Sequence, residues 1–308
     1  QYWLSETPIQ SNREDSTGST LIGVGTYHEH ARNHLMANVV NWSHHGNWKL
    51  DGHTIQWGVA YQLERINDHI REWEMRDSAG YSIPYSDEHI RLVNTMSSAV
   101  EMNSHRLTGY LQDTWRHRNE SGLWLVHAGL RLNHWSFNGE TLWSPRFSAT
   151  FLPVWKKNVT FRLAGGVYYQ APFYKELRDT VQVNGLTAIR LNRSIKAPRS
   201  LQAIGGMDYH FIWEDRPFKF TAEAYYKDLS RLIPYTVDNV RVRYSGENSS
   251  SGYTTGLDFK LFGEFVPGTD SWISLSFMRS RELIEGILIP RPNEQRYQCS
   301  IFFQDYFP

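Results

Sequence analysis

The sequence predicts an all-β chain whose antiparallel strands form part of a transmembrane β-barrel. Three observations lead to this fold class. Apolar and polar residues alternate with a period of two along most of the chain, aromatic residues make up 14% of it, and tight turns alternate with longer connections. Period-two alternation indicates strands with one apolar and one polar face. Aromatic enrichment is typical of the girdles at the two edges of a membrane barrel.

The composition argues against several other classes of protein. The 308 residues carry 32 basic and 32 acidic side chains, so no net field favours nucleic acid as a partner. No apolar run approaches the roughly 18 residues of a membrane helix, and the mean hydropathy is −0.53. Because Cys299 is the single cysteine, neither an intrachain disulfide nor a thiolate metal site is expected.

Alternation predicts about eleven strands along the chain. The clearest is "FKFTAEAYYKD", in which Phe220 and Ala222 alternate with Lys219, Thr221 and Glu223. The predicted strands cover residues 28–45, 47–66, 104–117, 122–137, 143–154, 158–170, 200–213, 217–230, 252–266, 270–283 and 294–306. Many of them exceed the roughly 9–11 residues that a tilted strand needs to cross a bilayer.

The connections between these strands form two alternating series. Tight turns are expected at "HHGNW", "HRNESG", "PVWKKN", "WEDRP" and "VPGTD", and the other links are mostly longer: 67–103, 138–142, 171–199, 231–251 and 284–293. Short periplasmic turns and long extracellular loops are typical of outer-membrane barrels, whereas a soluble β-sandwich has no reason to collect its long loops at one end. Bacterial single-chain barrels normally have an even number of strands and leave no open edge, so we expect residues 1–308 to be one partial barrel domain, truncated at both ends.

Five stretches in order resemble motifs of one family. "LWSPRFSATFLP" resembles the Ser-Pro-Arg strand of TonB-dependent outer-membrane receptors, and "TFRLAGGVYYQAPFYKEL" their glycine, tyrosine and Ala-Pro strand end. "LTGYLQDTWR", "FTAEAYYKDLSRLIPY" and "NSSSGYTTGLDFKL" are similar to further strands of the family. The C-terminal stretch resembles the Bacteroidetes branch. The matching motif positions are Ser144, Pro145, Arg146, Gly166, Tyr169, Ala171 and Pro172.

This resemblance implies a bacterial outer-membrane barrel of about 22 strands with a plugged lumen. It implies energy-coupled import of a scarce or large solute, such as an iron chelate, cobalamin or a glycan. The expected partners are outer-membrane lipid, the protein's own N-terminal plug domain, and TonB through an N-terminal box. Nothing in the sequence resembles the plug or the box, and the resemblance also allows a surface lipoprotein as a partner. No enzyme activity, cofactor or nucleic-acid partner is expected.

Ligand recognition is expected in the long loop 171–199. Its aromatic and basic groups could hold an anionic or sugar ligand by stacking and by charge-assisted hydrogen bonds. The alternative interpretation is that the loop packs against its neighbours. The candidate side chains are Phe173, Tyr174, Arg178, Arg190 and Arg193.

Charged and histidine side chains on the predicted strands suggest less specific roles. Arg162 and Glu223 lie on polar faces, where the expected role is cross-strand ion pairing in a wet lumen, with contact to a plug or substrate as the alternative. His28, His30 and His34 share one face of a predicted strand. Even spacing separates neighbours by about 7 Å or more, so no metal site is expected, because ligation needs three or four convergent ligands.

Two other functions remain open from the sequence. A passive outer-membrane porin or adhesin would have a similar barrel without energy coupling. A soluble β-rich carbohydrate-binding or carbohydrate-active module would also contain many Trp and Tyr residues. A membrane barrel needs lipid around its apolar face, whereas a soluble module covers that face with protein.

Overall fold

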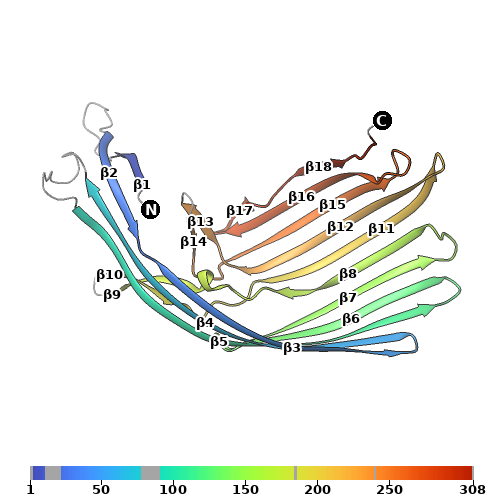
Figure 1. Ribbon diagram of the computed structural model, residues 1–308, viewed down its shortest axis with the longest axis horizontal. Helices are drawn as coiled ribbons and strands as arrows, with labels where there is room; N and C mark the ends of the chain where they lie inside the picture. The colour runs from blue at the N-terminus through green and yellow to red at the C-terminus, as the bar shows by residue number, and fades with distance from the viewer. Residues whose placement is uncertain (1–2, 11–21, 78–90, 184–185, 239–240, 307–308) are drawn as a thin grey trace. The chain divides into compact units, whose positions relative to one another are not determined.

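The computed structural model describes residues 3–10, 22–77, 91–183, 186–238 and 241–306. Within these ranges lie eighteen β-strands and one short 3-10 helix, Tyr174–Leu177 (Figure 1). No helix of the described residues has the length and apolar character that a membrane span requires. Neighbouring strands pair in antiparallel fashion, apart from a parallel bridge between β10 and β5. The predicted all-β antiparallel fold is confirmed.

The chain divides into two compact units. The first comprises Gln1–Val40, Glu64–Ser104 and Arg178–Asn192, and the second comprises Asn41–Leu63, His105–Leu177 and Arg193–Pro308. The long strands β3 (His34–Leu50), β4 (His53–Asp77) and β5 (Arg91–Arg118) contribute residues to both units.

The first unit contains β1 (Trp3–Gln10), β2 (Ile22–Ala31), β9 (Arg178–Val183) and β10 (Leu186–Leu191), together with parts of the long strands. β2 lies between β1 and β4. The hairpin of β9 and β10 is attached to β5 through the bridge between Thr187 and Met96. The Ser98 hydroxyl also donates a hydrogen bond of 3.1 Å to the carbonyl oxygen of Ile189. A loop segment in this unit is therefore a hairpin held against a long strand.

Most of the second unit is one continuous run of paired strands, and Figure 1 shows its members side by side in the order β6, β7, β8, β11, β12, β15 and β16. β11 and β12 stay in register from the pair of Arg199 with Ser230 to that of Trp213 with Arg216. Both β17 and β18 pair with β16. The strands of this run are β6 (Gly122–Trp135), β7 (Glu140–Pro153), β8 (Val159–Tyr169), β11 (Arg199–Trp213), β12 (Arg216–Leu232), β15 (Ser250–Gly263), β16 (Ser271–Ile284), β17 (Ile287–Pro290) and β18 (Tyr297–Phe302). A separate two-stranded sheet pairs β13 (Tyr235–Asp238) with β14 (Arg241–Tyr244).

The two faces of this run differ in polarity. One face leaves Leu163, Leu257 and Leu275 exposed by 57%, 47% and 39%. Successive side chains of a strand point to opposite faces, so Arg162 and Ser276 lie on the other face. A water-soluble protein buries such rows of leucine, whereas a membrane barrel turns them to lipid. We therefore call the leucine face the outward face and the opposite one the inner face.

The predicted turn at "HHGNW" is wrong. β3 continues through these residues to Leu50, and the chain reverses at Asp51 and Gly52, where Gly52 has a φ of +72°. Gly46 has a different purpose, because a Cβ atom at this position would lie 2.5 Å from the ring of Trp57 on β4. The glycine makes room for a neighbouring indole. The other four predicted turns are confirmed as connections between paired strands.

The predicted long links contain more strand than expected. β4 continues to Asp77 and β5 begins at Arg91, so much of 67–103 is strand. The predicted strand 28–45 is interrupted at Arg32 and Asn33, where β2 ends and β3 begins. The further strands lie outside the predicted set: β1, β9, β10, β13, β14 and β17. The predicted long links are therefore partly built from strands and hairpins.

The assignment of faces is tested by two arginine substitutions on adjacent residues of β16 in the full-length protein. Leu275→Arg places a charge on the outward face and should destabilise the folded barrel by about 2–4 kcal/mol if this position lies near the bilayer midplane. Ser276→Arg places the same charge on the inner face and should cost less than about 1 kcal/mol. Denaturant unfolding in lipid vesicles measures both values. Equal costs would contradict the assignment.

Candidate functional site

The inner face of the second unit carries a cross-strand cluster of charges. The buried carboxylate of Asp208 on β11 lies 3.1 Å from Nη2 of Arg162 on β8 and 3.3 Å from Nζ of Lys219 on β12. Thr221 Oγ1 donates a hydrogen bond of 2.8 Å to the same carboxylate. Glu223 lies 3.9 Å from Arg162, so two cations face two anions. The cluster presents fixed, alternating charge on the inner wall.

The Ser-Pro-Arg motif lies on β7, opposite the motif glycine of β8. Arg146 and Gly166 are Cα partners, and the Arg146 guanidinium lies 4.6 Å from the ring centroid of Tyr168. A Cβ atom on Gly166 would lie 2.9 Å from the carbonyl oxygen of Pro145 and 3.2 Å from Cγ of Arg146. The absence of a side chain at Gly166 therefore leaves room for the arginine beside Tyr168, where cation and ring attract each other.

The remaining motif residues mark where a strand becomes a loop. β8 ends at Tyr169, and Ala171 and Pro172 follow outside the ladder, as expected for a proline that cannot donate a hydrogen bond. The carbonyl oxygen of Pro172, itself buried, accepts a hydrogen bond of 3.5 Å from Nη2 of Arg106. The Arg106 guanidinium lies 4.0 Å from the ring centroid of Trp135, which is only 2% exposed. The first end of the loop is thereby anchored to β5 and β6.

A short 3-10 turn completes this first anchor. Tyr174 and Leu177 are buried, and the backbone N–H of Phe173 donates a hydrogen bond of 3.0 Å to Oε2 of Glu176. Burial raises the pKa of the Glu176 carboxyl above its ordinary value, although the hydrogen bond from Phe173 acts in the opposite direction. Burial, followed by the charges of Glu176 and Tyr235, raises the pKa of the Tyr244 phenol.

The second end of the loop is held by Glu140 and Asn248. Glu140 Oε2 accepts a hydrogen bond of 2.9 Å from the backbone N–H of Ala197. Asn248 Oδ1 accepts a hydrogen bond of 2.7 Å from the backbone N–H of Lys196. Asn248 Nδ2 donates one of 2.9 Å to the backbone carbonyl oxygen of Lys196. Ile195 is 1% exposed. Side chains that are distant in sequence therefore fix this segment in place.

An aromatic group lies beside the first anchor. The rings of Phe173 and Tyr244 meet edge to face with centroids 5.4 Å apart, and the Tyr235 ring lies 5.9 Å from that of Tyr244. Phe173 is 43% exposed and Tyr235 is 40% exposed. Exposed rings held in place by their neighbours are suited to stacking on a ligand.

The five predicted ligand residues have different environments in the structure. Phe173 is exposed in the aromatic group, whereas the next residue, Tyr174, is buried. The Arg193 guanidinium lies 5.2 Å from the ring centroid of Phe137. Arg178 and Arg190 belong to the first unit, where Nη1 of Arg178 lies 3.5 Å from a carboxylate oxygen of buried Asp68 and Arg190 is exposed on β10. Several of these contacts are of the loop-packing kind, and the ligand role of all five stays a prediction.

The sequence interpretation missed Tyr235, Tyr244, Glu140 and Asn248. The signal for the two tyrosines was present, because "YTVDNVRVRY" alternates on either side of a turn-forming Asp-Asn pair. No local pattern identifies Glu140 or Asn248. Among the residues that the structure describes, no three His, Cys, Asp or Glu side chains converge as metal ligands. The side chain of His28 lies outside the described residues.

An apolar outward face, a charged inner face and short turns at one end together define the wall of an outer-membrane β-barrel. A family model described as TonB dependent receptor-like, beta-barrel matches residues 3–295. The chain belongs to this family of Gram-negative outer-membrane proteins, which confirms the resemblance and the predicted location. The chain has no significant match among curated proteins.

Solved structures show the same fold at low sequence identity. The outer membrane transporter YddB from Escherichia coli aligns with a TM-score of 0.52 and 14% identity over 91% of this chain and 40% of its own. The ferric enterobactin receptor PfeA from Pseudomonas aeruginosa, in complex with BCV-L6, aligns with a TM-score of 0.51 and 15% identity. The alignment covers 87% of this chain and 41% of PfeA. FpvAI in its complex with pyocin S2 aligns with a TM-score of 0.50 and 12% identity, over 96% of this chain and 40% of its own. The chain thus spans about two fifths of the length of these neighbours.

Removing the carboxylate of Asp208 should weaken the folded barrel. Asp208→Ala leaves Arg162 and Lys219 on the inner wall without their shared partner, and we expect a loss of about 1–3 kcal/mol in the free energy of unfolding. Asp228→Ala is the control, because its ion pair with Arg199 is exposed and should contribute less than about 1 kcal/mol. Denaturant unfolding followed by tryptophan fluorescence compares the two variants. A smaller loss for Asp208→Ala than for the control would contradict the role of the cluster.

Glu176→Gln should tighten the 3-10 turn at neutral pH. A raised pKa means that the folded turn favours the protonated acid, so the contribution of Glu176 to stability is greatest at low pH and is lost as the pH rises through the folded-state pKa. The neutral glutamine keeps the acceptor for Phe173 and avoids the cost of burying a charge. Amide hydrogen exchange of residues 174–177 should therefore be slower in the variant at pH 7, and the difference should disappear below pH 4.5, the ordinary value.

The control for this substitution is Glu247→Gln, which changes an exposed loop carboxylate and should leave exchange in the turn unchanged. Faster exchange in Glu176→Gln at neutral pH would show that the charged hydrogen bond to Phe173 outweighs the cost of burial.

Proposed function

We propose that the complete protein imports a large or scarce solute across the outer membrane with energy supplied through TonB. This chain would supply part of the barrel wall and some of the loops that capture the solute, and it would catalyse no reaction. Iron chelates, cobalamin and glycans are the proposed substrate classes. A plug domain and TonB are the proposed partners, and a surface lipoprotein is a further candidate.

The difference between the two faces of one sheet carries this proposal. The outward face is apolar and suits lipid, while the inner face holds the cluster of Asp208, Arg162 and Lys219. A wall of this kind encloses a wet passage, and fixed charges on it can bind a plug or guide a solute. The family match supports the coupling to TonB.

Ligand capture is assigned to the loop end of the wall. Phe173, Tyr235 and Tyr244 form the aromatic group, and Arg193 lies on the neighbouring segment over Phe137. Both ends of the loop are anchored by side-chain hydrogen bonds, so Phe173 and Arg193 are held before a ligand arrives. Holding the contact groups in advance lowers the entropic cost of binding.

The proposal is tested by uptake in cells that produce the full-length protein as their only receptor of this kind. Labelled ferric chelates, cobalamin and oligosaccharides are supplied separately, with and without TonB. We expect uptake of one class, and this uptake should stop in cells that lack TonB. Uptake that continues without TonB would contradict the proposal and indicate a passive channel.

The loop assignment has a test of its own, once the cargo is known. Phe173→Ala combined with Tyr244→Ala should weaken binding of that cargo to the purified protein by about tenfold, which corresponds to about 1.4 kcal/mol, through loss of aromatic contact. Trp155→Ala is the matched control, since this exposed ring lies in the short connection between β7 and β8. Unchanged affinity in the double variant would contradict the assignment of the aromatic group.

A further inference from the structure

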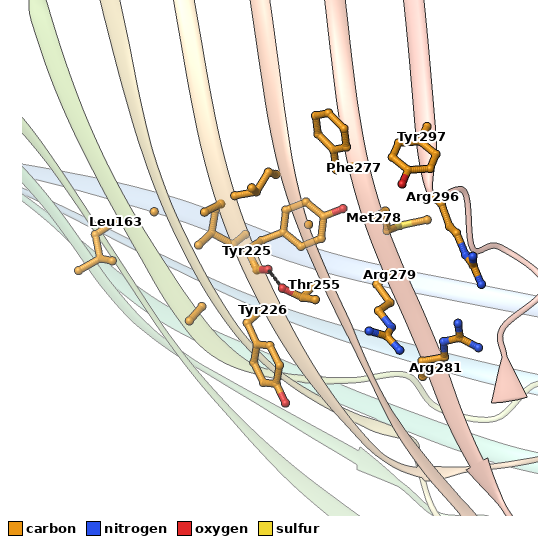
Figure 2. A pocket seen from close by; sticks show the side chains of 16 residues that line it. Leu163, Tyr225, Tyr226, Thr255, Phe277, Met278, Arg279, Arg281, Arg296 and Tyr297 are labelled. Atoms are coloured by element: carbon orange, nitrogen blue, oxygen red, sulfur yellow. Dashed lines mark hydrogen bonds between the residues drawn. The ribbon is translucent and has the colours of Figure 1, made fainter. Parts of the chain in front are cut away.

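The outward face of the second unit contains a groove of about 970 Å³. Its lining includes the small residues Ala203, Gly205 and Ala224, with larger side chains around them, among which are Leu163 and Phe277. Figure 2 shows Leu163 on one side of the groove and a group of arginines on the other. A stretch without bulky side chains leaves room for an apolar chain to lie against the sheet.

Three arginines gather at one end of this groove. Figure 2 shows Arg279, Arg281 and Arg296 side by side. The carboxylate of Glu294 lies 3.3 Å from Nε of Arg281 and 3.1 Å from Nε of Arg296. Among the described residues, no carboxylate lies within ion-pairing distance of Arg279. Three positive charges beside one negative charge leave the group with a net charge of +2.

The arginines begin where the apolar band of the outward face ends. Along β16, Ile273, Leu275 and Phe277 share this face, and Arg279 and Arg281 are the next two residues on it. These arginines lie toward the loop that follows β16, which in an outer-membrane barrel is the extracellular end. The change from apolar to basic therefore lies at the level of the outer-leaflet headgroups.

Aromatic side chains surround the same level. Tyr226 and Tyr253 stack with centroids 6.4 Å apart, and Tyr253 is the Cα partner of Arg281. Tyr297 packs edge to face on Phe277 and is 77% exposed. Exposed tyrosines are typical of the girdle between hydrocarbon and headgroups. The groove therefore reaches from the apolar band into the polar edge of the membrane.

We propose that this groove binds a phosphorylated, multiply acylated glycolipid of the outer leaflet. An acyl chain lies against Ala203, Gly205 and Ala224, and the phosphate pairs with Arg279 and Arg296. Guanidinium groups match phosphate oxygens in bidentate geometry, and the surplus charge of the group is complementary to a phosphate. This site is on the lipid side of the wall and is separate from the proposed passage for the cargo.

The test uses the full-length protein in detergent micelles, titrated with bis-phosphorylated lipid A and followed by native mass spectrometry. The double variant Arg279→Gln with Arg296→Gln should bind this lipid at least about tenfold more weakly than the wild-type protein. Lys227→Gln is the matched control, because it removes a positive charge from the inner face and should leave the affinity unchanged. Ala224→Phe fills the groove and should also weaken binding while all three arginines remain.

Dephosphorylated lipid A, phosphatidylglycerol and inorganic phosphate serve as alternative probes. The proposal expects each of them to bind more weakly than bis-phosphorylated lipid A. It is overturned if the double variant keeps its affinity, or if any of these probes binds as tightly as that lipid. Uptake of the cargo should be unchanged in the double variant, so a failure of lipid binding can be distinguished from a failure of the transport function.

Discussion

The structure depends on one constraint, which is that backbone N–H and C=O groups inside a bilayer have no water to pair with. In a chain that crosses as strands, only a continuous ladder between neighbours satisfies them. β11 and β12 keep such a ladder in unbroken register from Arg199 to Trp213. An uninterrupted ladder forces successive side chains to opposite faces. The apolar outward face and the charged inner face follow from that alternation.

Much of the fold could be predicted because this alternation is visible in short stretches of the sequence. In "FKFTAEAYYKD" the residues from Phe218 to Ala224 show their face by their own polarity, and β12 contains the whole stretch. The predicted turn at "HHGNW" is wrong because the reason for its glycine lies on another strand. Gly46 is small because Trp57 on the next strand occupies its side, which cannot be read from the five residues around it. The turn itself is at Asp51 and Gly52, an Asp-Gly pair of the kind that favours a tight hairpin.

The candidate site was less predictable because its contacts join segments that are far apart in sequence. Phe173 was identified from its own chemistry, but its partner Tyr244 lies on another hairpin. Glu140 and Asn248 act on the backbone of residues 196–197 through the registers of several strands. Without those registers, the sequence does not distinguish an anchoring carboxylate from an ordinary surface charge.

The anchored loop has a consequence for how such a protein can evolve. Residues 172–177 are fixed at one end by Arg106 and Glu176, and residues 195–197 are fixed at the other by Glu140 and Asn248. The chain between these ends includes the hairpin of β9 and β10, which contacts β5 through Thr187 and Ile189. It can be exchanged, lengthened or shortened without altering the ladder of β8 and β11, provided that the replacement still fits against β5. Selection for a new cargo can act on that insert while the wall retains its sequence, so specificity can diversify faster than the scaffold that carries it.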